Sequence, residues 1–367
     1  MIKSLLNFLF FNLAIFAISV SASARSSINN SNPYFFPDKY ASLVVDAKTG
    51  DILHQQNADA KRYPASLTKM MTLYLAFQAL NDRRLSMNEM VNVSRHAAAQ
   101  PRMKLGLRAG EKISVNDLIN SVIVLSANDS AVVLAERISG TESGFAKTMT
   151  NMAKYLGMKN TNFANASGLP NANQYTNAKD MAKLLVSLRR DFPQYYNLLS
   201  KKSFVYKRQE FGGHNRLLRD YAGAKAGKTG FINASGFNLA LNAERNGNSL
   251  VGVVMGGKSA TARDNHMRKI LDENFAMLNK NNGGTFFAKN NPTNVNRGAF
   301  QKPAIVYSNV KKPLTVDRFA KNNNVTNVKT INSYAMNDEK YSNRNSAPAS
   351  LSNGYQPKFF FYTSPVK

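Results

Sequence analysis

The chain has 367 residues, of which 48 are Lys or Arg and 22 are Asp or Glu, so its formal net charge is +26 at neutral pH. It contains no cysteine, which excludes disulfides, thiol catalysis and cysteine-ligated metals. Its four histidines are scattered without metal-ligand spacing, and we expect neither a metal nor a cofactor. So large a positive charge favours an anionic partner, such as a membrane surface, the cell wall or nucleic acid. A basic proteome with a solvated surface is the alternative explanation.

The N-terminus has the pattern of an export signal. Lys3 precedes an apolar run over residues 5–20, and Ala-Ser-Ala follows at 22–24. This order predicts a signal peptide over residues 1–24, while an uncleaved membrane anchor is the alternative. Export argues against a nucleic-acid partner. It predicts a periplasmic protein, with peripheral attachment to the outer face of the inner membrane left open.

The composition changes near residue 280, which predicts a folded domain over 25–280 and a separate tail over 281–367. The tail is rich in Asn and carries 12 Lys or Arg against three acidic residues. Such low complexity cannot bury much apolar surface, so we expect the tail to be largely disordered. Its charge fits contact with an anionic membrane surface or the cell wall, and an extension without a role fits equally well.

Two strand-like hairpins flank a helical region in the folded domain. The first pairs 40–46 with 51–54, and the second pairs 237–243 with 249–255. Periodic apolar residues predict helices over 67–80, 115–125, 130–138, 178–188 and 263–278. Strands at both ends of the domain predict an α+β fold, in which one antiparallel sheet is flanked by helices and carries a helical subdomain.

The first helix begins with a motif that suits nucleophilic catalysis, Ser66-Leu67-Thr68-Lys69. Ser66 is placed at the positive end of the helix, and Lys69 follows one turn later on the same face. A lysine can accept the serine proton when burial or a nearby cation disfavours its own charge. We therefore predict Ser66 as nucleophile and Lys69 as general base. Taken alone, the motif is explained better by a helix cap and a surface lysine.

A second motif, Ser126-Ala127-Asn128, lies between the two helices predicted over 115–125 and 130–138. Two buried helices would hold polar groups rigidly at this turn. Ser126 is predicted to relay a proton between Lys69 and the leaving group. Asn128 is predicted to orient Lys69 and to bind a substrate amide. An inter-helix turn capped by its own polar side chains is the alternative.

A third motif, Lys228-Thr229-Gly230, precedes the second hairpin. On a strand edge, Lys228 and Thr229 would bind a terminal carboxylate, and Gly230 would leave room for the substrate backbone. The N–H of Phe231 is predicted to form an oxyanion hole with the N–H of Ser66. The motif completes a candidate site for acyl transfer.

The three motifs in this order resemble penicillin-binding proteins and class A β-lactamases. From Pro37 to about Ala276 the chain resembles the low-molecular-mass penicillin-binding proteins that are D-alanyl-D-alanine carboxypeptidases. A Gly-Leu-Pro within 165–170 and the segment 214–218 also match that family. Arg263 falls where the family carries an arginine near the substrate carboxylate.

This resemblance implies a β-lactamase/transpeptidase-like fold and a serine acyl-transfer enzyme, with residues 25–280 as its catalytic domain. Ser66 would attack the carbonyl between two D-alanines of a peptidoglycan stem peptide and release the last D-alanine. Water would then hydrolyse the acyl-enzyme, and β-lactam antibiotics would acylate the same serine. The implied role is in cell-wall biogenesis and cell shape.

Three alternatives to this function stay open. A β-lactamase needs a glutamate that activates the deacylating water, and no clear candidate lies between Asn128 and Lys228. A wall-binding protein would keep the fold and act through its basic tail. Transpeptidation or endopeptidase activity would use the same residues. Many relatives also carry a strand-rich second domain and a C-terminal amphipathic helix, and the tail shows neither clearly.

Overall fold

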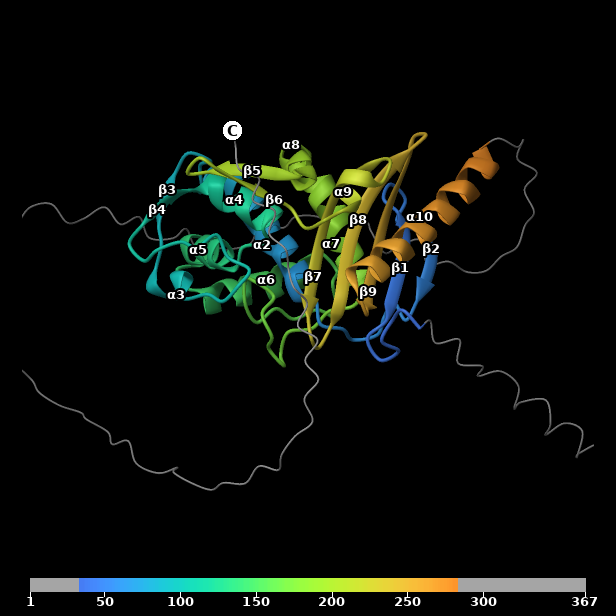
Figure 1. Ribbon diagram of the computed structural model, residues 1–367, viewed down its shortest axis with the longest axis horizontal. Helices are drawn as coiled ribbons and strands as arrows, with labels where there is room; N and C mark the ends of the chain where they lie inside the picture. The colour runs from blue at the N-terminus through green and yellow to red at the C-terminus, as the bar shows by residue number, and fades with distance from the viewer. Residues whose placement is uncertain (1–32, 283–367) are drawn as a thin grey trace, which may run out of the picture. The chain divides into compact units, whose positions relative to one another are not determined.

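The computed structural model describes residues 33–282 and centres on a five-stranded antiparallel sheet with the order β2-β1-β9-β8-β7 (Figure 1). The strands of this sheet are β1 (Ala41–Asp46), β2 (Ile52–Gln56), β7 (Ala224–Ile232), β8 (Gly236–Arg245) and β9 (Asn248–Gly257). Because β1 pairs with β9, the two ends of the domain meet in one sheet. The predicted signal peptide and all but the first two residues of the predicted tail lie outside the described residues.

Helices cover both faces of the sheet and form a helical subdomain beside it (Figure 1). The helices are η1 (Ala65–Thr68), α2 (Lys69–Asn81), α3 (Arg95–Ala98), α4 (Val115–Val124), α5 (Asn128–Ser139), α6 (Glu142–Tyr155), α7 (Ala178–Asp191), α8 (Pro193–Tyr196), η2 (Asn197–Ser200), α9 (Leu217–Asp220) and α10 (Ala260–Asn282). Two small two-stranded sheets complete the fold: β3 (Met90–Asn92) with β4 (Lys112–Ser114), and β5 (Ser203–Tyr206) with β6 (Gln209–Gly212).

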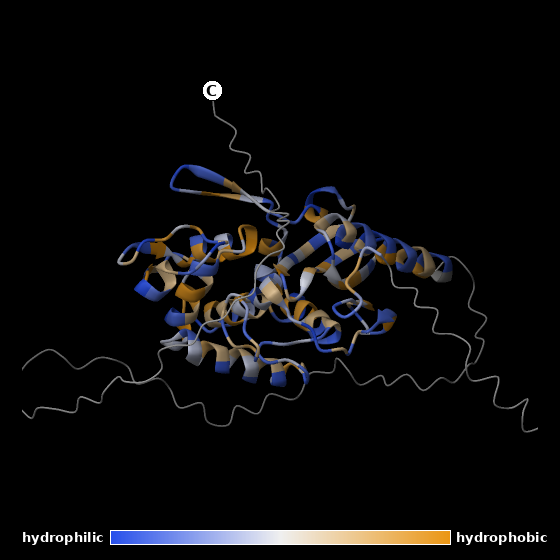
Figure 2. Cartoon of the chain, turned by 60° about the horizontal axis from the view of Figure 1, so that its bottom comes forward, coloured by the Kyte–Doolittle hydropathy of each residue, from blue (hydrophilic) through white to orange (hydrophobic). Residues whose placement is uncertain are grey.

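The sheet separates two apolar clusters. Alternate residues of a strand point to opposite faces, so Leu43 packs with the helical subdomain while Val44 packs with α10. α7 contacts β9 and β1, and α10 contacts β9 and β8. Hydrophobic segments lie mainly inside the domain, whereas several projecting loops are hydrophilic (Figure 2). No helix among residues 33–282 is long and apolar enough to cross a membrane.

The predicted sheet, both hairpins and the five predicted helices are confirmed, with boundaries shifted by a few residues. The Lys-Thr-Gly motif was expected on a strand edge, but the extent of β7 was not predicted, and α6 was not expected. The β7 sequence is rich in Ala, Lys and Gly, which have weak strand propensity, and pairing with β8 makes it a strand. α6 buries Phe145, Ala146, Met149 and Ala153 at helical spacing, so the sequence did contain a signal for this helix.

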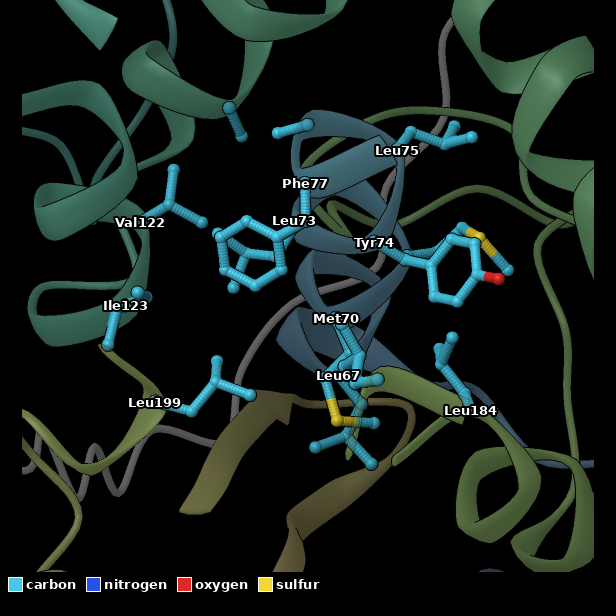
Figure 3. Packing of buried hydrophobic residues seen from close by; sticks show 14 of the residues in the cluster. Leu67, Met70, Leu73, Tyr74, Leu75, Phe77, Val122, Ile123, Leu184 and Leu199 are labelled. Carbon is cyan, nitrogen blue, oxygen red and sulfur yellow. The ribbon is translucent and has the colours of Figure 1, made fainter. Parts of the chain in front are cut away.

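α2 lies at the centre of the helical subdomain rather than on its surface. Every residue from Lys69 to Phe77 is buried, so this part of α2 has no side that faces solvent. Val122 and Ile123 of α4 lie on one side of α2, and Leu184 of α7 lies on another (Figure 3). A helix buried all round is held firmly, so its N-terminus is a rigid position for a reactive side chain.

A chain of hydrogen bonds ties β1, β2 and α10 together away from the three motifs. His266 Nε2 lies 2.8 Å from Tyr40 Oη, and Tyr40 Oη lies 2.9 Å from Ser42 Oγ. Ser42 Oγ in turn lies 2.8 Å from His54 Nε2. Burial, followed by the charges of His54 and Lys269, lowers the pKa of His266 from its ordinary 6.5 to about 4.

We expect this histidine to make the fold acid-sensitive. Between pH 6.5 and about 4 the unfolded chain binds a proton at residue 266 that the folded protein does not, so the free energy of unfolding falls as the pH falls through this window. His266→Gln can still hydrogen-bond but cannot bind that proton. Its thermal midpoint should therefore fall less than that of the wild type between pH 6.5 and 4, and an equal fall would contradict the prediction.

Candidate active site

Ser66 and Lys69 occupy the junction between the 3-10 turn η1 and helix α2. The Lys69 side chain is fully buried and its Nζ donates to three oxygens: Ser66 Oγ at 3.1 Å, Asn128 Oδ1 at 2.7 Å and the Ser167 carbonyl at 2.5 Å. An ammonium group has three protons, so every donor of a charged Lys69 is used. This geometry places the predicted base in contact with the predicted nucleophile.

The surroundings of Lys69 disfavour the protonated, positively charged form of its side chain. Burial lowers the pKa of Lys69 well below its usual range, and the nearby charge of Lys228 lowers it further, whereas Asp129 acts in the opposite direction. A buried lysine beside another cation loses its proton more readily. The neutral amine can then accept a proton from Ser66 Oγ.

A second lysine–serine pair lies near enough for the charge of its lysine to act on Lys69. Ser126 adopts a left-handed backbone conformation with φ of 61°, and its Oγ accepts a hydrogen bond from Lys228 Nζ at 2.8 Å. Lys228 is buried, and its Nζ also donates to the Thr229 carbonyl at 2.9 Å. Burial and the charge of Arg263 lower the pKa of Lys228 to about 7. The pair therefore holds a cation whose charge depends on pH near neutrality.

Asn128 is the first residue of α5, not part of a free loop between helices. Its Nδ2 donates to the carbonyls of residues 101 and 102 at 3.0 and 3.2 Å, which turns Oδ1 toward Lys69. The buried carboxylate of Asp129 accepts hydrogen bonds from the N–H groups of residues 105, 106 and 107. The start of α5 thus fixes both the amide that contacts Lys69 and the neighbouring segment.

Two glycines allow the rest of the site to close around η1. A Cβ at Gly230 would lie 3.0 Å from the Ser66 nitrogen, so β7 lies directly against the nucleophile turn. A Cβ at Gly168 would overlap the Ala65 carbonyl, and Gly168 also has a φ of 86° that favours glycine. Close approach of two backbone segments to Ser66 therefore depends on the missing side chains.

The remaining predicted residues take different positions. Thr229 is half-buried on β7, and Phe231 follows with a side chain that is 43% exposed. Arg263 is only 3% exposed, and its Nε and Nη2 donate to Asp264 Oδ1 at 2.9 and 2.6 Å. Arg263 is thus engaged by its neighbour on α10, although its charge still reaches Lys228.

Two contributors to the site were not predicted from the sequence. The carbonyl of Ser167 binds Lys69, and Asp129 acts on the same lysine electrostatically. Every residue has a backbone carbonyl, so the sequence could not show that the carbonyl of Ser167 binds Lys69. The Gly-Leu-Pro that follows Ser167 was the only indication that this segment belongs to the site. Asp129 could have been noticed in the sequence, because it is an acidic residue in the first turn of a predicted helix, where the helix dipole favours negative charge.

The sequence that forms this site matches a known protein family. The sequence profile of the D-alanyl-D-alanine carboxypeptidases matches residues 37–259, which is more than half of the chain. The chain belongs to the D-alanyl-D-alanine carboxypeptidase family. It is a serine-type carboxypeptidase, a hydrolase, and a penicillin-binding protein, which confirms the predicted family and activity.

Individual members of the family are similar over most of the folded domain. D-alanyl-D-alanine carboxypeptidase DacA of Haemophilus influenzae is 36% identical over 269 residues, which are 72% of this chain and 68% of the relative. Penicillin-binding protein 5 of Haemophilus influenzae superimposes with a TM-score of 0.63 at 36% identity, covering 64% of this chain and 70% of the other. Penicillin-binding protein D2 of Listeria monocytogenes in a cefotaxime-bound form gives a TM-score of 0.60 at 30% identity and covers 66% of this chain and 99% of the other. These likenesses confirm the predicted fold class.

Proposed function

We propose that this carboxypeptidase removes the terminal D-alanine from peptidoglycan stem peptides through an acyl ester on Ser66. The observation that carries the proposal is the buried Lys69, whose pKa is depressed and whose Nζ lies 3.1 Å from Ser66 Oγ. Neutral Lys69 takes the hydroxyl proton as Oγ attacks the carbonyl of the penultimate D-alanine. Ser126 relays a proton to the departing amine of the last D-alanine. Water then cleaves the ester, which restores Ser66 and releases the shortened peptide.

Residues of β7 are proposed to hold the substrate during this reaction. Lys228 and Thr229 bind the terminal carboxylate, and Gly230 admits the substrate backbone. The N–H groups of Ser66 and Phe231 stabilise the oxyanion, and one such donor is typically worth about 10²–10³ in rate. Arg263 is bound to Asp264, so we assign its influence on the carboxylate to its charge near Lys228.

The same serine is proposed to react with β-lactams, which mimic the scissile amide. Support comes from the similarity to Penicillin-binding protein D2 of Listeria monocytogenes, which has both cefotaxime-bound and ampicillin-bound forms. We further propose that residues 25–280 are the catalytic domain of an exported, periplasmic protein with a role in cell-wall biogenesis and cell shape. The basic tail over 281–367 is proposed to contact an anionic membrane surface or the cell wall, on the basis of its charge.

The test is D-alanine release from a stem pentapeptide ending in D-Ala-D-Ala, with the full chain and with Ser66→Ala. We expect Ser66→Ala to lower release by at least about 10³-fold, because no other hydroxyl among residues 33–282 is hydrogen-bonded to Lys69 Nζ. Ser143→Ala, at an exposed position of α6, is the matched control and should behave as the wild type. Release of D-alanine by Ser66→Ala at the wild-type rate would refute the assignment of Ser66 as the nucleophile. Rapid turnover of penicillin without D-alanine release would favour a β-lactamase. The absence of both reactions would favour a wall-binding protein.

A further inference from the structure

Two lysines from opposite ends of the domain surround one aromatic ring beside the candidate active site. Lys39 Nζ lies 4.3 Å from the centroid of the Phe36 ring, and Lys258 Nζ lies 5.9 Å from it. Lys39 precedes β1, whereas Lys258 directly follows β9. We call Phe36, Lys39 and Lys258 the Phe36 cluster.

The positive charge of the Phe36 cluster is not neutralised within residues 33–282. Neither lysine forms an ion pair there, although Asp38 is a neighbour of Lys39 in sequence. Lys258 is exposed and Lys39 is partly exposed, so both ammonium groups are accessible from solvent. The face of an aromatic ring attracts cations and holds them in place without cancelling their charge.

The Phe36 cluster lies at the end of β7, the strand that carries the Lys-Thr-Gly motif. Lys39 Nζ donates to the carbonyl of Asn233 at 3.1 Å, one residue beyond the end of β7. A Cβ at Gly236 would lie 3.1 Å from the Phe36 ring, which places that ring against the β7–β8 turn. The exposed ring of Phe231 packs on Phe237 of β8 with centroids 4.3 Å apart. Phe231, the first residue after the Lys-Thr-Gly motif, and the Phe36 cluster thus both lie at the β7–β8 end of the sheet.

β7 is an edge strand, and an extended peptide can pair with such an edge. If the terminal carboxylate lies at Lys228 and Thr229 and the scissile carbonyl at the Phe231 N–H, the substrate runs antiparallel to β7. Each residue then advances by about 3.3 Å along the strand. The residue before D-Ala-D-Ala consequently lies beyond Phe231, where its side chain extends toward the Phe36 cluster.

We propose that the Phe36 cluster selects substrates in which the residue before D-Ala-D-Ala carries a free carboxylate on its side chain. This inference rests on the proposed function, since it assumes the substrate path along β7. Lys39 and Lys258 attract such a carboxylate and repel an ammonium group at the same place. The selection acts on the side chain of the acyl part of the substrate and is separate from binding of the terminal carboxylate.

The test compares three Nα-acetylated tripeptides X-D-Ala-D-Ala of similar size, in which X is L-2-aminoadipate, L-norleucine or L-lysine. The full chain should hydrolyse them with kcat/KM falling in that order. We expect about a 3- to 10-fold difference between the aminoadipyl and norleucyl peptides, because exposed charge pairs are individually weak. The difference should shrink at high salt, which screens charges on the surface.

The double variant Lys39→Gln/Lys258→Gln should bring the aminoadipyl-to-norleucyl ratio close to one. Lys147→Gln removes a charge at an exposed position of α6 and should keep the wild-type ratio. Equal rates for all three peptides with the wild type, or an unchanged ratio in the double variant, would overturn the inference while D-alanine release continued to support the proposed function. No release from any of the peptides, or from the stem pentapeptide, would overturn both.

Discussion

Lys69→Met is expected to slow the acylation of Ser66 by a fluorescent penicillin by about 10²–10⁴-fold, the range typical of losing a general base. Methionine is unbranched and flexible like lysine and only one atom shorter, so α2 can remain packed as it is. It has no nitrogen to take the proton from Ser66 Oγ, which Lys69 Nζ approaches at 3.1 Å. Stopped-flow fluorescence of the full chain measures the rate directly.

The stability of Lys69→Met is expected to change little, because two opposing effects accompany the substitution. A buried cationic group is removed, which stabilises the folded protein. Asn128 Oδ1 and the Ser167 carbonyl lose their donor, which costs about 1–3 kcal/mol for each buried acceptor left unpaired. A thermal midpoint close to that of the wild type would therefore show that the loss of activity is chemical.

The pH dependence of acylation provides a second readout for Lys69. Its depressed pKa means that acylation by the wild type should rise with pH as Lys69 loses its proton, whereas Lys69→Met should lack this rise. Lys154→Met, at an exposed position of α6, is the matched control and should keep the wild-type profile. An acylation rate in Lys69→Met equal to that of the wild type would assign the base to another residue.

Gly168→Ala is expected to destabilise the folded protein by about 3–5 kcal/mol, the combined cost of backbone strain and overpacking. The backbone φ of 86° is unfavourable for alanine, and the new Cβ would overlap the Ala65 carbonyl beside the nucleophile. Because both partners are backbone, neither can move without displacing η1. Denaturant unfolding measures the change, and the thermal midpoint should drop by about 2–4 °C for each kcal/mol.

The variant Gly157→Ala separates the cost of backbone strain from the cost of overpacking. Gly157 has a φ of 74°, but no atom lies within 4 Å of the position that its Cβ would take. This variant should therefore lose only about 1–2 kcal/mol through backbone strain. Acylation by penicillin should fall in Gly168→Ala and stay unchanged in Gly157→Ala. Equal losses of stability in the two variants would show that contact with η1 contributes nothing.

Local patterns in the sequence predicted much of the fold. Both hairpins of the main sheet and the helices α2, α4, α5, α7 and α10 follow from periodic apolar residues and turn signals, which depend on neighbours in sequence. β7 could not be predicted in this way. Its small and polar residues have little strand propensity, and pairing with the longer β8 decides its conformation.

The sequence by itself predicted which groups would carry the chemistry and determined their order, because a serine, two lysines and an asparagine in three motifs are local features of the chain. Only the tertiary structure decided their chemical state. Burial lowers the pKa of Lys69, and its Nζ contacts Asn128 and Ser167, which lie 59 and 98 positions away in sequence. The structure likewise shows Arg263 bound to Asp264. Desolvation and charge act through space, so a pKa depends on which distant segments pack around a side chain, and a residue pattern does not contain that information.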